Sequence, residues 1–567
     1  MNIKRNPSNL NQEFHIVVIG GGITGLAIAR EAAERGLKTA IIEKNDFGCA
    51  TSAATSKLIH GGLRYLENME FGLVRESLRE RKIMGNAAAH LVMPLPIILP
   101  VYNFSKPGKF MMRIGLRLYD LLSFDRNFFT PKDKKMPASR WISRRKVLEL
   151  APCMKEEGLK GGFVYYDLQS LHPERLSLAF LKTAVSSGAV AFNHMSADSF
   201  QTSDTNGKKR ILSVHTTDLI TGKKYKIRGQ VFVNCTGPWL DYTLGRVMET
   251  PAQTLQRSQG IHILSKDICG KYAVLHRNEA GRHFFILPWM NLSLTGPTDT
   301  PFADHPDTLY PGYKDSSDLI HTVNQSLTNP IKTSGVKSIL IGLRPLISSG
   351  TSTYKASRKS EIYNHAAEGF PGLFSVAGGK LTTSRDLGEQ TVKKIIRSGE
   401  LKGIAAKKSS SLKSPLFGSI CYGDSHEEYE AKALRDYALT FLPEDSHRHL
   451  IRLYGTEHRE ILHLLKDKPQ LAEQIVPELP DILAQVYYGV THESARTLED
   501  MLNRRLAMGT LGYPGDKAVQ KVSGIMAKIL KWTPAAARKE ISAYKKDYPS
   551  IENVKQRESP GKKKKSS

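Results

Sequence analysis

The most constraining feature of the chain is a glycine-rich turn near its N-terminus, within HIVVIGGGITGLAIAREAAERGLKTAIIEK (residues 15–44). A short apolar run precedes the turn, the periodicity of an amphipathic helix follows it, and a second apolar run ends in Glu43. Gly20, Gly22 and Gly25 have the G-x-G-x-x-G spacing. This order of strand, turn, helix, strand and acidic residue is typical of a unit that binds an adenine dinucleotide.

Each residue of this unit has a physical role in such a site. Gly20 permits the tight turn, Gly22 lets the backbone approach a pyrophosphate, and Gly25 lets the helix pack closely on the strand. The N-terminus of the helix then faces the negative charge. Glu43 is placed to accept hydrogen bonds from a ribose hydroxyl. A glycine-rich turn without a ligand is the alternative, and the complete unit favours the dinucleotide site.

The motif by itself does not distinguish FAD from NAD, but two later stretches favour FAD. VFVNCTGPWLD (231–241) is a β-branched run that ends in Thr236 and Gly237. LFSVAGGKLTTSRDLGEQTVKKII (373–396) is an apolar run, a double glycine and a helical pattern. It offers a second helix N-terminus, which suits the negative side of a reduced flavin. An ordinary β-to-α turn is the alternative for either stretch.

A third stretch, TSKLIHGGLRYLE (55–67), groups His60, Arg64 and Tyr65 around two glycines. Arginine can donate two hydrogen bonds to a phosphate and tyrosine can add a third. Histidine titrates near neutral pH and can take up a proton. The pattern predicts Arg64 and Tyr65 in the first turn of a helix, where an anion is favoured. A surface ion pair, a core tyrosine and a buried histidine are the alternatives for each residue taken alone.

With these stretches, the chain resembles the FAD-dependent glycerol-3-phosphate dehydrogenases of the D-amino-acid-oxidase-like flavoprotein superfamily. The resemblance covers nearly the whole chain and implies an α/β fold (α+β overall). An FAD-binding Rossmann-like domain would be interleaved with a β-sheet substrate or cap domain and followed by a C-terminal helical domain. The matching stretches, in the family's order, are CATSAATSKLIHGGLRYLE (49–67), RHFFILPWM (282–290), TGPTDT (295–300), GLRPL (342–346), GGKLTTSR (378–385) and HESARTLEDMLNRRLAM (492–508).

The resemblance also implies residue roles. The substrate phosphate would be held by Arg64, Tyr65 and Arg358, of which Arg358 is the loosest match. The glycerol hydroxyls beside the flavin would be surrounded by His60, Arg344 and Lys380. Non-covalently bound FAD would be contacted by Gly20, Gly22, Gly25, Glu43, Thr51, Ser52, Ser56, Gly237, Gly379 and Thr382.

The implied reaction is the oxidation of sn-glycerol 3-phosphate to dihydroxyacetone phosphate, with hydride transfer to N5 of FAD and electrons passed on to a quinone. We expect His60 to act as the base, because a guanidinium such as that of Arg344 does not deprotonate readily. Arg344 would stabilise the developing alkoxide and Lys380 the reduced flavin. No metal is expected.

Three features depart from the family's pattern: LHPERL (171–176), Pro297 and Gln259. They bear on substrate preference more than on the flavin. An oxidase that uses O2 and produces H2O2 is one alternative, and a paralogue acting on another small hydroxy or amino substrate is a second.

The 567 residues exceed the usual size of a single core, so several domains are expected. We predict a flexible N-terminus (1–12) and an FAD-binding domain (13–400) whose cap lies mainly at about 90–165 and 240–345. A linker (401–419), a helical domain (420–548) and a basic disordered tail (549–567) would follow. No run of apolar residues reaches the length of a membrane-spanning helix.

The net charge of +26 favours an anionic partner. In GKFMMRIGLRLYDLLSF (108–124), Lys109, Arg113 and Arg117 would form one basic stripe of a helix lying on an anionic membrane surface. A core-packed helix with a solvated basic edge is the alternative. Because the resembling family is monotopic, we expect peripheral attachment at the cytoplasmic side of the inner membrane. A homodimer is compatible with the sequence.

A nucleic-acid-binding flavoprotein is a further alternative suggested by the charge. It would require aromatic residues interleaved with the basic ones, whereas the basic segment is rich in aliphatic residues. No nucleic acid is therefore expected.

The cysteines are five in number and scattered: Cys49, Cys153, Cys235, Cys269 and Cys421. Their spacing predicts neither a disulfide framework nor a zinc site, and it favours a reducing compartment.

Overall fold

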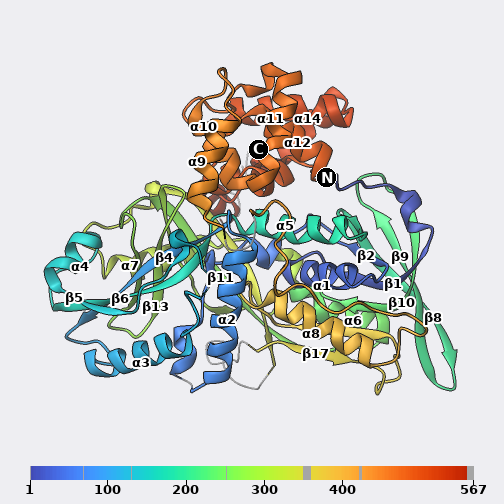
Figure 1. Ribbon diagram of the computed structural model, residues 1–567, viewed down its shortest axis with the longest axis horizontal. Helices are drawn as coiled ribbons and strands as arrows, with labels where there is room; N and C mark the ends of the chain where they lie inside the picture. Colours follow the sequence, from blue (N-terminus) through green and yellow to red (C-terminus); the bar gives the residue numbers. More distant parts are fainter. Residues whose placement is uncertain are drawn as a thin grey trace, which may run out of the picture.

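A computed structural model describes residues 2–67, 69–128, 130–250, 252–348, 359–420 and 424–558 (Figure 1). Two β-sheets and the helices around them form the lower part of the view, and a helical domain, drawn in orange and red, lies above them. The candidate site depends on how these parts meet.

The first sheet carries the glycine-rich turn. Its strand order is β17-β18-β10-β1-β2-β7. The central pairs β1–β2, β1–β10 and β10–β18 are parallel, and such strands read as continuous apolar runs because both of their faces are buried. The strands are β1 (Glu13–Ile19), β2 (Thr39–Ile42), β7 (Val190–Phe192), β10 (Lys224–Asn234), β17 (Glu361–Asn364) and β18 (Leu373–Ala377).

Alternate residues of β1 enter two different cores. Ile16 and Val18 pack with α1 (Ile23–Glu34), α5 (Pro173–Ser186) and α8 (Ser384–Arg397). Val17 and Ile19 pack on the opposite face with the ribbon β8 (Met195–Thr205) and β9 (Lys208–Asp218) and with α6 (Leu240–Met248). The sheet is therefore covered on both sides, as a Rossmann-like domain requires.

The second sheet has the order β15-β11-β14-β13-β12-β4-β6-β3, with β16 also paired to β11 and β5 to β6. Its strands alternate along the chain with those of the first sheet, so the two domains are interleaved and the predicted fold class is confirmed. The strands are β3 (Leu58–Ile59), β4 (Val92–Tyr102), β5 (Arg140–Ser143), β6 (Leu159–Ser170), β11 (Leu255–Lys266), β12 (Ala273–Arg277), β13 (His283–Trp289), β14 (Leu292–Gly296), β15 (Thr300–Pro301) and β16 (Val336–Ile347). The accompanying helices are α2 (Phe71–Ala87), α3 (Lys109–Leu122), α4 (Arg144–Leu150) and α7 (Tyr313–Asn324).

The helical domain has its own apolar core. Across the described parts of the chain, none of the helices combines the length and the apolar character needed to cross a bilayer. The helices of this domain are α9 (His426–Asp436), α10 (Glu444–Tyr454), α11 (His458–Asp467), α12 (Leu483–His492), the π-helix η10 (Asp500–Arg505), α13 (Met508–Leu511), α14 (Asp516–Leu530), α15 (Pro534–Asp547) and α16 (Ile551–Glu558).

Both ends of the chain differ from the flexible segments expected at 1–12 and 549–567. Ile3 is buried and its N–H donates to the carbonyl of His492 at 2.9 Å, while Arg5 pairs with Asp218 at 2.8 Å. At the other end, Ile551 and Val554 of α16 pack into the core of the second sheet. These apolar contacts order segments whose local composition is polar; residues 559–567 lie outside the described part.

The spacing of the cysteines predicted no disulfide framework, yet one disulfide forms. Cys153 and Cys269 are bonded, with their Cα atoms 5.5 Å apart and a sequence separation of 116. Both sulfur-bearing side chains lie in the core of the second sheet. Spacing along the chain did not reveal the pair because only the folding of the sheet brings its members together.

We predict that peptides containing Cys153 and Cys269 remain joined in a digest of the unreduced protein and separate on reduction. Replacing both residues by alanine should destabilise the fold by about 2–4 kcal/mol, because the closed loop is long. Peptide mapping by mass spectrometry tests the bond, and recovery of both cysteines as separately alkylated thiols would contradict it.

Candidate active site

A cavity of about 1190 Å³ opens where the parallel strands of the first sheet end. Its lining includes Ile19 and Gly20 after β1, Ile42 and Glu43 after β2, and Cys235 after β10. Parallel sheets bind ligands at the carboxyl ends of their strands. The volume exceeds the range of roughly 300–1,000 Å³ typical of sites for one small molecule, so it suits a dinucleotide with a substrate beside it.

The glycines of the turn have the contacts that their spacing predicted. Gly20 has a φ of +107°, and a Cβ on it would lie 2.5 Å from the carbonyl oxygen of Cys235. A Cβ on Gly25 would lie 2.0 Å from the carbonyl oxygen of Gly20. Larger residues would separate α1 from β1. Gly22 caps α1 and lines the cavity, so the N-terminus of the helix faces the ligand space.

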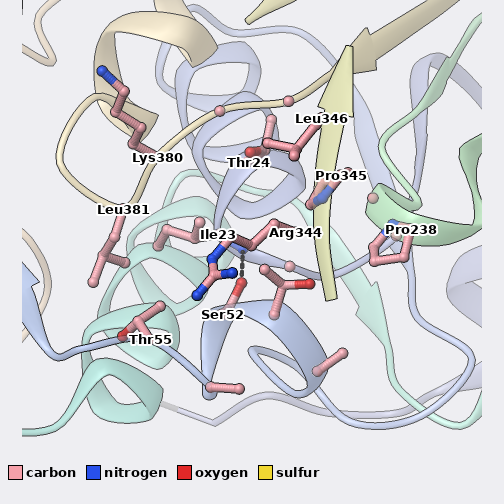
Figure 2. Close-up of a pocket in the computed structure, with 18 of the residues that line it drawn as sticks. Ile23, Thr24, Ser52, Thr55, Pro238, Arg344, Pro345, Leu346, Lys380 and Leu381 are labelled. Atoms are coloured by element: carbon pink, nitrogen blue, oxygen red, sulfur yellow. Dashed lines mark hydrogen bonds between the residues drawn. The ribbon is translucent and has the colours of Figure 1, made fainter. Parts of the chain in front are cut away.

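The loop of residues 43–52 closes over the same turn. The Glu43 carboxylate accepts hydrogen bonds from the backbone N–H of Gly21 at 2.6 Å and of Asn45 at 2.8 Å. Burial raises the pKa of Glu43 in spite of these bonds. Ser52 Oγ accepts a hydrogen bond from the N–H of Ile23 at 2.9 Å, shown by the dashed line in Figure 2. Glu43 thus orders the turn in addition to lining the cavity.

The stretch around His60 is built by close contacts of its two glycines. A Cβ on Gly61 would lie 2.3 Å from Leu78, and a Cβ on Gly62 would lie 2.0 Å from the ring of Tyr65. The N–H of His60 donates to Thr382 Oγ1 at 3.0 Å. Because Gly61 and Gly62 have no side chains, this segment can fit between α2, Tyr65 and the start of α8.

Arg344 of β16 and Lys380 of the turn after β18 both line the cavity. In Figure 2 they come from different segments, and the Lys380 side chain extends away from the Arg344 guanidinium. The Arg344 guanidinium donates to the carbonyl of Thr298 at 3.0 Å and lies 3.9 Å from the carboxylate of Asp299. The Lys380 ammonium lies 4.0 Å from the centre of the Tyr65 ring. Both cations are thus oriented by described neighbours.

The structure brings most of the predicted site residues together in this cavity. Gly25 and Thr382 lie behind its lining, where they pack the turn and hold the backbone of His60. Arg64 lies in the short helix η3 (Leu63–Leu66), but its side chain and all of Arg358 lie outside the described part of the chain. The predicted residues that line the cavity are Gly20, Gly22, Glu43, Thr51, Ser52, Ser56, His60, Tyr65, Gly237, Arg344, Gly379 and Lys380.

Sequence reasoning missed a buried charge pair behind His60. Asp167 lines the cavity and accepts hydrogen bonds from Arg81 at 2.5 Å, from the Tyr119 hydroxyl at 2.7 Å and from the N–H of Gly61 at 3.2 Å. These residues come from β6, α2 and α3, and no local motif connects them.

Arg277 and His283 also line the cavity and were missed. His283 begins the strand within RHFFILPWM, a stretch that carried the family resemblance, so the signal was present for that residue. Of the departures from the family's pattern, Pro297 lines the cavity, whereas the side chain of Gln259 donates to Asp315 at 2.7 Å.

His262 of β11 is a further cavity residue that the sequence did not single out. Its Nε2 lies 2.8 Å from Ser56 Oγ. Burial, together with the positive charges of Arg344 and Lys57, lowers the pKa of His262 to about 3. The imidazole is therefore neutral at physiological pH and adds no charge to the cluster around Arg344.

These residues fit FAD. A helix N-terminus bare of side chains at Gly22 suits a pyrophosphate, and the same cavity is lined by the cations of Arg344 and Lys380. The turn at Gly378 and Gly379, with φ values of +71° and +107°, brings backbone close to the same space. The fold and the site together define a flavin-dependent oxidoreductase.

Comparison with known proteins gives the same class. Residues 15–385 match the FAD dependent oxidoreductases, and residues 409–537 match the C-terminal domain of alpha-glycerophosphate oxidase. The chain is 36% identical to the glycerol-3-phosphate dehydrogenase of Synechocystis sp., covering 95% of this chain and 97% of the relative. It is 31% identical to the human mitochondrial glycerol-3-phosphate dehydrogenase, covering 94% and 73%.

A solved structure agrees over the same length. The glycerol-3-phosphate dehydrogenase from Bacillus halodurans, complexed with FAD, superposes with a TM-score of 0.76 at 25% identity and covers 96% of each chain. The chain belongs to the glycerol-3-phosphate dehydrogenases within the FAD-dependent oxidoreductase family. The predicted family and the predicted FAD cofactor are thereby confirmed.

The neutral His262 predicts a pH dependence of stability. An unfolded histidine has a pKa of about 6.5, so below that pH the unfolded state binds more protons than the folded state. The stability contributed by neutral His262 is complete above pH 6.5. It falls by about 1.4 kcal/mol per pH unit as the pH drops towards 3.

We expect the free energy of unfolding of wild type to fall more steeply between pH 6.5 and 4.5 than that of His262→Gln. Urea unfolding at several pH values measures the two slopes. Equal slopes would show that His262 is protonated in the folded protein.

Proposed function

We propose that the protein oxidises sn-glycerol 3-phosphate to dihydroxyacetone phosphate. The observation that carries the proposal is the presence of His60, Arg344 and Lys380 in one cavity that also receives the N-terminus of α1. These three residues come from segments far apart in sequence. The relatives named as glycerol-3-phosphate dehydrogenases support the same substrate.

Bound FAD supplies the acceptor for the hydride that leaves the secondary carbon of the substrate. His60 takes the proton from the hydroxyl on that carbon, and its backbone is fixed by the bond to Thr382. Arg344 stabilises the negative charge that develops on the oxygen. Asp299 and the carbonyl of Thr298 hold the guanidinium in place for that task.

The substrate phosphate is held on the cationic side of the cavity. Tyr65 and Lys380 lie against each other there, and Arg277 and His283 also line the cavity. A phosphate dianion gains from charge-assisted hydrogen bonds to such groups. Arg64 precedes Tyr65 in η3 and adds a further cation to this segment.

We also propose a quinone as the acceptor that reoxidises the flavin. The match of residues 409–537 to a domain of alpha-glycerophosphate oxidase makes oxygen the alternative acceptor. After anaerobic reduction by glycerol 3-phosphate, a short-chain ubiquinone should restore the oxidised flavin spectrum faster than air does. Faster reoxidation by air, with formation of peroxide, would favour the oxidase.

Replacing His60 by asparagine tests the chemical step. We expect FAD binding to be retained, while anaerobic reduction of the flavin by glycerol 3-phosphate slows about 10²–10⁴-fold, the usual contribution of a general base. His215→Asn, at an exposed histidine of β9, is the matched control and should reduce at the wild-type rate. Stopped-flow absorbance measures both, and unchanged reduction in His60→Asn would exclude His60 as the base.

The surface around α3 supports peripheral attachment to a membrane, which we propose for this protein. On α3, Leu116 and Tyr119 are buried, whereas Phe110, Ile114 and Leu121 are 75%, 46% and 67% exposed. A helix packed only into the core would not leave these apolar side chains in water. The further exposed apolar residues nearby in sequence are Met69, Phe71, Phe104, Met111, Phe124 and Phe128.

Basic residues accompany this apolar surface. Lys109, Arg113 and Arg117 are exposed on the same helix, and each basic residue near an anionic bilayer contributes about 1 kcal/mol. In Figure 1, α3 lies at the lower edge of the molecule and the helical domain at the top. We place α3 on the cytoplasmic side of the inner membrane. The Cys153–Cys269 bond is compatible with this location, because its buried sulfur atoms are inaccessible to reducing thiols.

We predict that the protein sediments with vesicles containing anionic lipid. Phe110→Ser combined with Leu121→Ser should weaken this binding about tenfold or more, because two large apolar side chains no longer enter the interface. The matched control is Leu212→Ser with Ile220→Ser, at two exposed apolar residues of β9 and of the turn that follows it. Equal binding of the two double variants, or no sedimentation of wild type at low salt, would contradict the proposal.

A further inference from the structure

The 43–52 loop lines the dinucleotide cavity on one side and contacts the helical domain on the other. Asp46 is fully buried in this loop. Its carboxylate accepts hydrogen bonds from Arg504 Nε at 2.7 Å, from Arg505 Nη1 and Nη2 at 2.6 and 3.0 Å, and from Asn193 Nδ2 at 2.8 Å. Two guanidiniums from the last third of the chain thus converge on one carboxylate.

The π-helix η10 makes this convergence possible. Its wider turn lets the consecutive residues Arg504 and Arg505 reach the same carboxylate, and such turns are frequent at functional sites. Asp500 of the same element accepts a hydrogen bond from Arg504 Nη2 at 2.7 Å and lies 2.9 Å from His194 Nε2. Within the helical domain, Asp500 thus orients Arg504, and the carbonyl of Glu493 orients Arg505 by accepting from its Nη2 at 2.7 Å.

The other side of the loop is bonded to the glycine-rich turn. The N–H of Gly48 donates to the carbonyl of Gly21 at 2.9 Å, and Glu43 and Ser52 accept from Gly21 and Ile23. A displacement of Asp46 would therefore shift groups that line the cavity at the start of α1.

A metal ion is one possible occupant of this cluster, because one potential ligand atom from each of three residues lies within 4.8 Å of the others: Asp46, His194 and Asp500. The two carboxylates are already neutralised by Arg504 and Arg505. A divalent cation would leave this buried cluster with excess positive charge, which is costly. The cluster is an ion-pair junction between domains.

We propose that the helical domain forms part of the FAD site, with Arg504 and Arg505 acting as positioning residues for the 43–52 loop. Binding of FAD and docking of the helical domain are then coupled, and each stabilises the other by the same free energy. The inference rests on FAD binding and not on the identity of the substrate. A protein that binds FAD but is not reduced by glycerol 3-phosphate would contradict the proposed function and leave this inference standing.

A second buried ion pair between the same domains provides a control. Lys182 of α5 pairs with Glu457 and lies 3.0 Å from Glu493. Glu457 also accepts a hydrogen bond from the Tyr488 hydroxyl at 2.8 Å. Among the described residues, neither Lys182 nor Glu457 lines the cavity or bonds to the 43–52 loop.

The test compares Asp46→Asn with Glu457→Gln, since each removes one buried carboxylate charge without changing its shape. FAD titration of the apoprotein, followed by flavin fluorescence, should give a Kd about 10–100-fold higher for Asp46→Asn, within the range usual for the coupling of two sites. Glu457→Gln should change the Kd less than about twofold, because this pair is not coupled to the 43–52 loop, while it lowers the thermal midpoint of the apoprotein to a similar extent. Equal changes in Kd would overturn the proposal.

Hydrogen exchange provides a measurement that would not change if Arg504 and Arg505 had only a structural role. Addition of FAD should protect backbone amides of residues 494–507 in wild type and in Glu457→Gln, and not in Asp46→Asn. Absence of protection in wild type would overturn the coupling. If Asp46→Asn is insoluble, Arg504→Lys keeps the charge and the Arg505–Asp46 bonds. Its Kd should rise by a smaller factor than that expected for Asp46→Asn, and an unchanged Kd would contradict the proposal.

Discussion

The close approach of α1 to β1 is the contact on which the rest of the site depends. Gly25 sits so near the carbonyl oxygen of Gly20 that a Cβ would lie 2.0 Å from it. This packing places the N-terminus of the helix at the end of the strand, where its partial positive charge faces the cavity. The 43–52 loop, the turn after β10 and the turn after β18 are then arranged around that point.

The interleaving of the two sheets gives this cavity its chemistry. The first sheet supplies the helix N-terminus and the turn that carries Lys380, while the second supplies Arg344 and His262. His60 lies at the end of β3, where the chain passes between the sheets, and its backbone is bonded to Thr382 at the start of α8. A dinucleotide and a small phosphorylated alcohol can therefore share one cavity that both domains line.

Local motifs predicted the parts of the structure that local contacts determine. The glycine spacing predicted the β1–α1 turn, and the stretch 55–67 predicted that His60 and Tyr65 would share a site. The sequence did not predict contacts that form only in the complete fold. These are the Cys153–Cys269 disulfide, the hydrogen bond from Arg81 to Asp167, and the hydrogen bonds from Arg504 and Arg505 to Asp46. Their partners lie from 86 to 459 residues apart, so no window of sequence contains both.

We expect FAD to lie with its pyrophosphate at the N-terminus of α1 and its flavin among His60, Arg344 and Lys380. A crystal structure of the protein with bound FAD tests it most directly. In that structure the pyrophosphate should lie beside Gly22, and the isoalloxazine ring should lie within contact distance of Arg344 and Lys380. A flavin bound in the reverse direction, or in a different cavity, would contradict it.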